Sequence, residues 1–248
     1  MKGKGKIFFA SDFHLGLTAG TNPLERERRI VRWLHMAAAE ASEIYLLGDV
    51  FDFWWEYRLV VPRGFTRFLG KLSSLTDSGI PVHFFTGNHD MWTFDYLSRE
   101  CGLIVHKEPL TTKFDGHTFH LAHGEGLGSR SIIYRILLSI FRNKVLQAMY
   151  SALHPALGVG FGLKWSLNSR LGKGVHLDFM GDLNEDLLRY SRTILEEQKI
   201  DHFIFGHRHL PLTYIMKEGP SVIFLGDWIS SGSYAVWDGS ELKLEEFI

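Results

Sequence analysis

The sequence predicts an α/β fold in which parallel strands are joined by helices. Short apolar runs typical of strands alternate with longer stretches typical of helices, and each of the first three strands ends in a cluster of polar residues. Parallel strands need a crossover between them, usually a helix, and ligands collect at the carboxyl ends of such strands. The expected strands and helices in this half of the chain, in order, cover 7–10, 24–41, 44–47, 65–78 and 81–85.

The second half of the chain predicts further β structure around a helical stretch. Residues 103–105, 110–114 and 117–122 alternate as short strands do, with Asp115-Gly116 as a hairpin turn. Helix-like segments follow to about residue 200. The remaining strands are expected at 203–205, 214–217, 221–225, 234–237 and 242–247.

The composition is that of a globular protein with balanced charge. The chain has 248 residues, of which 45% are apolar and 22% charged, and its net charge is −1. A charge so close to zero gives no signal for nucleic acid as a partner. With Cys101 as its single cysteine, the chain has no internal disulfide, and we expect a reducing compartment, the cytoplasm. No uncharged apolar run is long enough to span a bilayer.

The first polar cluster places a carboxylate and an imidazole two residues apart. Asp12 and His14 follow the strand at 7–10, and in an extended segment side chains two apart face the same side. An isolated pair of this kind is more often a turn aspartate with an incidental histidine. The other strand ends change that interpretation, because they carry similar groups.

Five strands each deliver metal-competent side chains into a loop. Seven ligands are too many for one tetrahedral ion and suit two ions that share a carboxylate. Oxygen and imidazole donors without thiolate favour Mn²⁺ or Fe²⁺, with Zn²⁺ also compatible. Six other histidines, at 35, 83, 106, 117, 120 and 202, we interpret as structural. The clustered residues are Asp12, His14, Asp49, Asn88, His89, His123, His207 and His209.

These motifs, in this order and spacing, resemble those of the calcineurin-like metallophosphoesterase superfamily. They are Asp-x-His at 12–14, Gly-Asp at 48–49, Gly-Asn-His-Asp at 87–90, His-Gly at 123–124 and Gly-His-x-His at 206–209. The resemblance implies a four-layer αββα sandwich of two mixed sheets between helices. It also implies a metal-bound hydroxide as the nucleophile.

The resemblance further implies a role for each clustered residue. His89 would stabilise the transition state or protonate the leaving oxygen, and Asp90 would orient His89. Asp49 would bridge the two metals. One metal would be held by Asp12, His14, Asp49 and His209, and the other by Asp49, Asn88, His123 and His207.

Residues 127–177 differ in character from the rest of the chain. They contain seven basic residues and no acidic one, so subtracting +7 from the net charge of −1 leaves −8 on the remainder. The segment is also apolar at helical spacing. We predict a basic, apolar helical cap inserted into a core formed by 1–126 and 178–248. Such a cap suits an anionic substrate with acyl chains and a phosphate-rich membrane surface, but an ordinary lid explains the pattern equally well.

A narrower resemblance favours the acylated substrate. The segments 123–125, 141–145, 168–170 and 225–228, together with Tyr134, are similar to those of the UDP-2,3-diacylglucosamine pyrophosphatases of lipid A synthesis. These enzymes release UMP and a diacylglucosamine 1-phosphate by attack at the α-phosphorus. Well-known members have Arg in place of His89 and Asp in place of Glu125. The substrate contacts implied here are Asn88, His89, Tyr134, Ser169, Arg170, Lys173 and His207.

Three functions fit these observations. The first, which we take, is a two-metal (Mn²⁺) pyrophosphatase that cleaves an acylated nucleotide sugar at the inner face of the cytoplasmic membrane. The second keeps the metals but acts on a soluble nucleotide or another phosphodiester. The third is a non-catalytic binding scaffold, which the full set of seven ligands disfavours. The sequence gives no indication of the oligomeric state.

Overall fold

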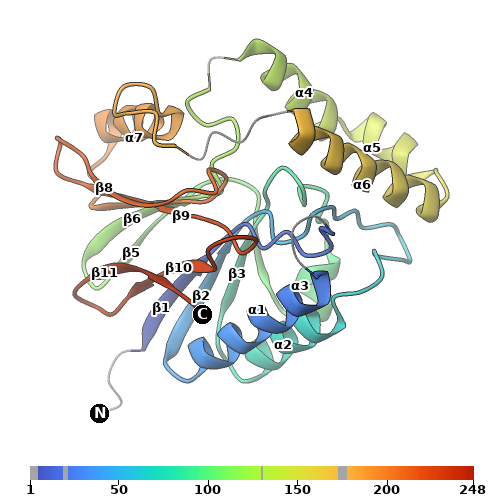
Figure 1. The fold of residues 1–248 in the computed structure, drawn as a ribbon, viewed down its shortest axis with the longest axis horizontal. Helices are drawn as coiled ribbons and strands as arrows, with labels where there is room; N and C mark the ends of the chain where they lie inside the picture. The colour runs from blue at the N-terminus through green and yellow to red at the C-terminus, as the bar shows by residue number, and fades with distance from the viewer. Residues whose placement is uncertain (1–4, 19–21, 130, 173–177) are drawn as a thin grey trace.

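Two β-sheets packed face to face form the centre of the molecule (Figure 1). The computed structural model describes residues 5–18, 22–129, 131–172 and 178–248, without the side chains of 135 and 169–172. The first sheet contains, in spatial order, β11 (Leu242–Glu246), β10 (Ser233–Trp237), β1 (Lys6–Ala10), β2 (Ala41–Leu47), β3 (Val82–Phe85) and β4 (Ile104–His106). The second contains β5 (Leu110–Phe114), β6 (His117–Ala122), β7 (His202–Phe205), β9 (Ser221–Leu225) and β8 (Pro211–Ile215).

Both sheets are mixed, as predicted. In the first, β1 to β4 pair in parallel, while β10 and β11 are antiparallel additions at one edge. In the second, β6, β7 and β9 are parallel and the two edge strands are antiparallel. The helices α1 (Pro23–Ala38), α2 (Thr66–Asp77) and α3 (Tyr96–Cys101) cover the first sheet, and α7 (Asp186–Glu197) covers the second (Figure 1). The four-layer αββα sandwich is therefore confirmed.

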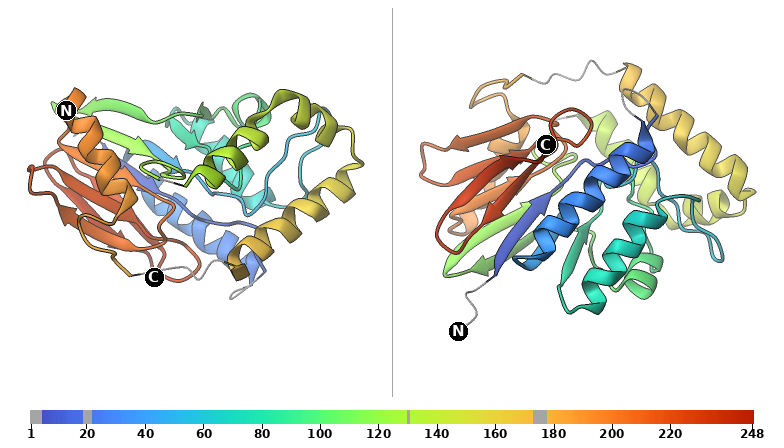
Figure 2. Two further views of the ribbon diagram at one scale, coloured as in Figure 1. Left: turned by 90° about the horizontal axis from the view of Figure 1, so that it is seen from above. Right: turned by 60° about the horizontal axis from the view of Figure 1, so that its bottom comes forward.

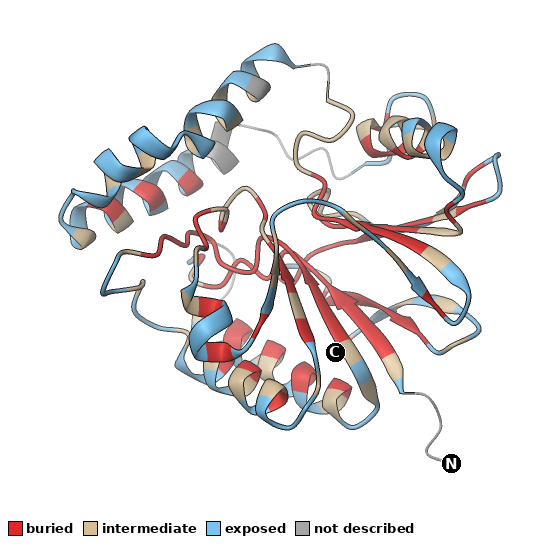
Figure 3. Cartoon of the chain, turned by 180° about the vertical axis from the view of Figure 1, so that it is seen from behind, coloured by how far each residue is buried: buried red, intermediate tan, exposed pale blue. Residues whose placement is uncertain are grey.

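Three apolar layers hold the sandwich together, and the buried strands show as red ribbons in Figure 3. Phe8 faces α1, whereas the adjacent Phe9 faces the second sheet. Successive side chains of a strand point to opposite faces, so a strand buried on both faces reads as a continuous apolar run. The third layer, which includes Leu187 and Phe203, lies between the second sheet and α7.

The boundaries of some elements differ from the prediction. Asn22 caps α1 by accepting a hydrogen bond from the backbone of Leu24, and the helix ends at Ala38 because β2 begins at Ala41. The strand predicted at 214–217 is β8, which spans Pro211–Ile215. It ends at Ile215 because residues 216–220 form the turn into β9. The short helix α3 was not predicted.

Three helices stand outside the four layers: α4 (Ile132–Arg142), α5 (Lys144–Ser151) and α6 (Pro155–Gly172). Figure 2 shows them together at one end of the molecule. We call α4–α6 the helical cap. Among the described residues, none of the helices combines the length and the apolar character that crossing a bilayer requires.

Candidate metal centre

The predicted ligands converge at the carboxyl ends of β1, β2, β3, β6 and β7. Among the described residues, three groups place their ligand atoms within 4.8 Å of one another. These groups share members, so they form one continuous cluster. They are Asp12 with His14 and His209, His14 with Asp49 and His89, and Asp49 with His123 and His207.

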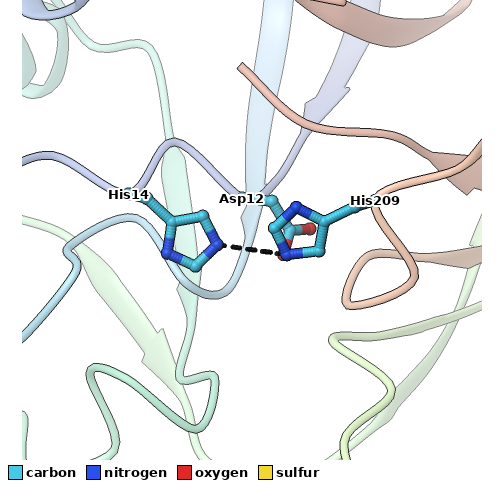
Figure 4. Close-up of side chains that lie close together, drawn as sticks. All are labelled: Asp12, His14 and His209. Atoms are coloured by element: carbon cyan, nitrogen blue, oxygen red, sulfur yellow. Dashed lines mark hydrogen bonds and ion pairs between the residues drawn. The ribbon is translucent and has the colours of Figure 1, made fainter. Parts of the chain in front are cut away.

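The first group is the one shown in Figure 4. Oδ1 of Asp12 lies 3.3 Å from Nε2 of His209 and 3.6 Å from Nε2 of His14. The two Nε2 atoms are themselves 3.3 Å apart. A carboxylate and two imidazole nitrogens that face one point form a partial coordination sphere for a divalent ion.

Asp49 lies between this group and the other histidines. Its Oδ2 is 3.3 Å from Nε2 of His123, 3.9 Å from Nε2 of His14 and 4.0 Å from Nε2 of His89. One carboxylate thus faces imidazoles on both sides. This is the position that a residue bridging two ions would occupy.

Buried polar atoms without partners support a metal site here. Among the described residues, Oδ1 of Asp12, Oδ1 of Asn88 and Nε2 of His123 are buried without a hydrogen-bond partner. Such atoms are rare in folded proteins, because desolvation without compensation is costly. The three belong to residues of the predicted ligand set. Divalent cations would satisfy them, so the residues present fit metal ions.

The electrostatics of the cluster agree with this fit. Burial raises the pKa of Asp12, because the charged carboxylate is removed from water. Burial alone would lower the pKa of His123, but the neighbouring carboxylates, Asp49 foremost, together outweigh burial and raise that pKa well above its ordinary value. The carboxylates therefore attract positive charge, which a metal ion would provide.

The loops that carry the ligands have unusual backbone conformations. Five of the predicted ligands lie in the left-handed region, which non-glycine residues seldom adopt. Such strain persists where the surrounding structure enforces it, and it is concentrated at functional sites. The φ angles are 55° at Asp12, 44° at His14, 50° at Asp49, 65° at His207 and 51° at His209.

Glycine next to a ligand serves two different purposes. Gly48 has a φ of 84°, so it allows the sharp turn before Asp49. Gly87 lies outside the left-handed region, and its role is close approach. A Cβ atom at Gly87 would lie 2.3 Å from Oδ1 of Asp49. The loop after β3 can therefore pack against Asp49 only without a side chain at this position.

A second set of contacts fixes the orientation of the ligands. Nδ1 of His123 lies 2.8 Å from the carbonyl oxygen of Leu47, and Nδ1 of His209 lies 3.1 Å from Oδ2 of Asp227. Such contacts turn the other ring nitrogen, Nε2, toward a metal. The sequence reasoning missed this role for Asp227. Its signal was the segment 225–228, a strand end followed by an aspartate.

His89 is oriented by residues other than the one we expected. Its Nδ1 lies 2.9 Å from the carbonyl oxygen of Asp52 and 3.2 Å from Oγ of Ser166, a buried residue of α6. The prediction that Asp90 orients His89 is corrected by this geometry. Asp90 is fully buried, and its carboxylate accepts hydrogen bonds from the backbone amides of Val50, Phe51 and Gly87. Asp90 thus joins the loops after β2 and β3.

A cavity of about 780 Å³ lies between the helical cap and the core. Most of its lining is apolar, and Asn88, His89 and His207 of the cluster form part of its wall. Tyr134, a predicted substrate contact, also lines it. Lys173 and the side chains of Ser169 and Arg170 lie outside the described residues. The apolar lining includes Phe53, Trp55, Trp92, Phe141, Tyr150 and Trp165.

The aromatic run at 51–55 is divided between this cavity and the core. Phe51 and Trp54 pack in the layer beneath the first sheet, whereas Phe53 and Trp55 line the cavity. The run therefore serves both as a wall of the cavity and as part of the core.

A family model described as calcineurin-like phosphoesterase matches residues 5–211. The chain belongs to this family. A relative from Porphyromonas gingivalis, named UDP-2,3-diacylglucosamine hydrolase, is 44% identical over 255 residues, covering 98% of this chain and 97% of the relative. A relative of the same name from Stenotrophomonas maltophilia is 28% identical and covers 96% of both chains. A solved phosphoesterase from E. coli has a TM-score of 0.45 and 15% identity, covering 96% of this chain and 90% of its own.

Calcineurin-like phosphoesterases act with divalent metal ions, and the cluster supplies the carboxylate and imidazole groups that could bind them. The chain is a metal-dependent hydrolase of phosphoric esters or anhydrides. Two observations disfavour the alternative of a non-catalytic scaffold. The chain belongs to a family of phosphoesterases, and the predicted ligands are gathered at one edge of the sandwich.

Proposed function

We propose that this phosphoesterase hydrolyses the pyrophosphate of UDP-2,3-diacylglucosamine to UMP and 2,3-diacylglucosamine 1-phosphate (lipid X). The observation that carries the proposal is the large apolar cavity whose wall includes Asn88, His89 and His207. A soluble nucleotide needs no apolar cavity of this size, whereas acyl chains do. The printed name of the P. gingivalis relative, at 44% identity, supports the same substrate.

The proposal includes two Mn²⁺ ions, because oxygen and imidazole donors suit that ion. Asp12, His14, Asp49 and His209 would hold one ion, and Asp49, Asn88, His123 and His207 the other. Ions bound there would activate water and offset the charge of the phosphates. The 3.3 Å contacts of Asp49 with His123 and of Asp12 with His209 support this division.

His89 is the proposed general acid. The carbonyl oxygen of Asp52 can only accept a hydrogen bond, so Nδ1 of His89 carries a proton and donates it there. The Nε2 edge then faces the cluster, 4.0 Å from Oδ2 of Asp49. In this orientation the imidazolium form of His89, with a second proton on Nε2, would stabilise charge on the reacting phosphates or deliver the Nε2 proton to the leaving oxygen. Asp90 supports the site by joining two loops.

Residues 127–177 act in this proposal as a cap inserted into a core of 1–126 and 178–248. The aromatic side chains of the cavity would hold the acyl chains. Tyr134, which lines the cavity, and Ser169, Arg170 and Lys173 would contact the sugar and its phosphate. The cap therefore selects the substrate, while the core carries out the hydrolysis.

The outer surface of the cap supports association with a membrane. Ile133, Val145 and Met149 are 81%, 68% and 65% exposed, which is unusual for large apolar side chains. Cations of the cap, such as Lys144 on α5 and Lys164 on α6, would attract anionic headgroups. We place the enzyme in the cytoplasm, at the inner face of the cytoplasmic membrane, where an acylated substrate resides.

The test is product analysis after hydrolysis in heavy-oxygen water with Mn²⁺ and detergent micelles. We expect UMP and lipid X as products, with the heavy oxygen in the UMP phosphate. Label in the sugar phosphate would contradict attack at the α-phosphorus. Hydrolysis of a generic phosphodiester without any turnover of UDP-2,3-diacylglucosamine would favour the soluble-substrate alternative.

A further inference from the structure

A second, smaller hollow of about 210 Å³ lies beside the metal centre. His123 belongs both to its wall and to the group of Asp49 and His207. Leu138 of α4 lines this hollow and also the apolar cavity, so the two spaces are adjacent at this helix. The small hollow has a more polar wall, which includes Thr86, His106, Lys107, Glu125 and Arg142.

The shape of the proposed substrate requires two spaces around the metal centre. Its pyrophosphate lies between a diacylated sugar and a uridine. When the phosphates are at the metal centre and the acyl chains occupy the apolar cavity, the uridine must extend from the metal centre in another direction. The small hollow shares His123 with the metal centre and offers that direction.

Hydrogen bonds across β2, β3 and β4 determine which nitrogen of His106 carries a proton. Tyr45 donates to Glu43 over 2.6 Å, and Nε2 of His83 lies 3.4 Å from the same carboxylate. A carboxylate only accepts, so when the ring of His83 holds one proton, that proton is on Nε2 and Nδ1 is an acceptor. The hydrogen bond from His83 lowers the pKa of Glu43, which keeps the carboxylate ionised.

The same reasoning extends to the wall of the hollow. Nδ1 of His83 lies 2.8 Å from Nε2 of His106, so Nε2 of His106 must donate. Burial lowers the pKa of His106, and the neighbouring His83 lowers it further, which favours the neutral form of this ring. The remaining nitrogen of His106, Nδ1, is therefore a hydrogen-bond acceptor on a residue that lines the hollow.

The donor and acceptor pattern of the wall matches uracil. The base edge of uracil has one donor, N3–H, between two carbonyl oxygens. The wall combines an acceptor at His106 with the cations of Lys107 and Arg142, and Arg142 lies 4.0 Å from Glu108, which with Glu125 also lines the hollow. The acceptor suits N3–H, and the cations suit the carbonyl oxygens beside it. Cytosine has an unprotonated N3, which would face the lone pair of His106. From this match we infer that the small hollow binds the uridine half of the substrate and recognises its base through His106. This inference rests on the proposed function.

The sharpest test changes the ligand and leaves the protein unaltered. At pH 8 with Mn²⁺, hydrolysis of a generic phosphodiester is measured with UMP, CMP, N3-methyl-UMP or inorganic phosphate as inhibitor. UMP is expected to inhibit about tenfold more strongly than CMP or N3-methyl-UMP, because these lack the N3–H donor. Equal inhibition by the three nucleotides would overturn the inference.

Variants locate the effect in the hollow. The ratio of the inhibition constants for UMP and inorganic phosphate is compared in Lys107→Ala, Arg142→Ala and His106→Ala, with thermal unfolding measured for each. The ratio is expected to rise severalfold in all three. Lys144→Ala is the matched control: Lys144 and Lys107 both lie over the ring of Phe94, at 5.7 and 5.6 Å, but Lys144 is outside the wall of the hollow. An unchanged ratio in Lys107→Ala and Arg142→Ala would contradict the inference.

The inference and the proposed function fail in different ways. If the enzyme hydrolyses UDP-2,3-diacylglucosamine but does not distinguish UMP from N3-methyl-UMP, only the uridine site is wrong. If it hydrolyses the generic phosphodiester but not the acylated substrate, the proposed function is wrong.

Discussion

The metal centre and the helical cap are built in opposite ways. Asp12 and His14 have no exposed surface, and the loops that carry them are held in strained left-handed conformations. In the cap, α5 has no buried residue, and Ile133 of α4 is 81% exposed. The core thus fixes a few polar side chains closely, whereas the cap presents apolar surface both to a cavity and to the outside.

This difference indicates that the core carries out the hydrolysis and that the cap selects the substrate. Catalytic and metal-binding groups need positions fixed to within a fraction of an ångström, which buried loops between packed strands can provide. Acyl chains need only an apolar volume of suitable size, which a few helices can enclose. Changes in the core should therefore affect every substrate, and changes in the cap should affect only the acylated one.

The largest effect is expected for Asp49→Ala. Asp49 faces His14, His89 and His123, so its loss should abolish metal binding as well as turnover. We expect hydrolysis of both the acylated substrate and a generic phosphodiester to fall by about a thousandfold or more. Bound metal is measured by elemental analysis and folding by circular dichroism. Activity within tenfold of the wild type would contradict the metal assignment.

Gly87→Ala tests the close approach of the two loops. The added methyl group would lie 2.3 Å from Oδ1 of Asp49, so Asp49 must move. We expect a loss of about a hundredfold on both substrates, partly restored by excess Mn²⁺. Gly70→Ala is the control, because no atom lies within 4 Å of a Cβ at that helical position. Equal activities of the two variants would show that the packing is unimportant.

Gly162→Leu tests the apolar cavity. A Cβ at Gly162 would lie 2.2 Å from the ring of Phe53, so a leucine there must displace the cavity wall. We expect kcat/KM for the acylated substrate to fall about tenfold, with a much smaller change for a generic phosphodiester. Gly160→Leu on the same helix meets no atom within 4 Å of its Cβ and should resemble the wild type. A parallel loss on both substrates would show that the cap does not select.

Ser166→Ala tests the contact between the two regions. Oγ of Ser166 donates to Oδ2 of Asp52 over 3.0 Å and lies 3.2 Å from Nδ1 of His89. Since the carbonyl of Asp52 still holds His89, we expect kcat to fall only about fivefold. The pH profile of kcat is expected to shift as well, whereas a purely structural effect would lower the melting temperature and leave the profile in place.

The smallest effect on catalysis is expected for the double variant Ile133→Asp and Val145→Asp. Both side chains lie on the outer surface of the cap, and charges there oppose insertion into lipid. Sedimentation with anionic vesicles should show binding reduced about tenfold. If this variant binds vesicles as strongly as the wild type, the outer surface of the cap does not bind the membrane.

Local patterns predicted the parallel strands and the gathered ligands, whereas the four-layer sandwich was implied by the resemblance to the calcineurin-like superfamily. His123, for example, directly follows a buried strand, and parallel strands bring such positions to one edge of a sheet. The sequence did not identify Ser166 or Asp227 as positioning residues, because Ser166 lies on a helix of the cap and Asp227 stands outside the motifs of the ligand set. Asp90 was misassigned because its sequence position beside His89 does not reveal that its carboxylate turns toward backbone amides.

The most direct test of the division between core and cap is the ratio of two kcat/KM values. UDP-2,3-diacylglucosamine and UDP-glucosamine without acyl chains are compared in the same micelles with Mn²⁺. Because burial of the acyl chains in the cavity contributes favourable free energy, we expect the acylated substrate to be preferred by about a hundredfold or more. Equal kcat/KM values would contradict the role of the cap and leave the metal centre to explain the activity alone.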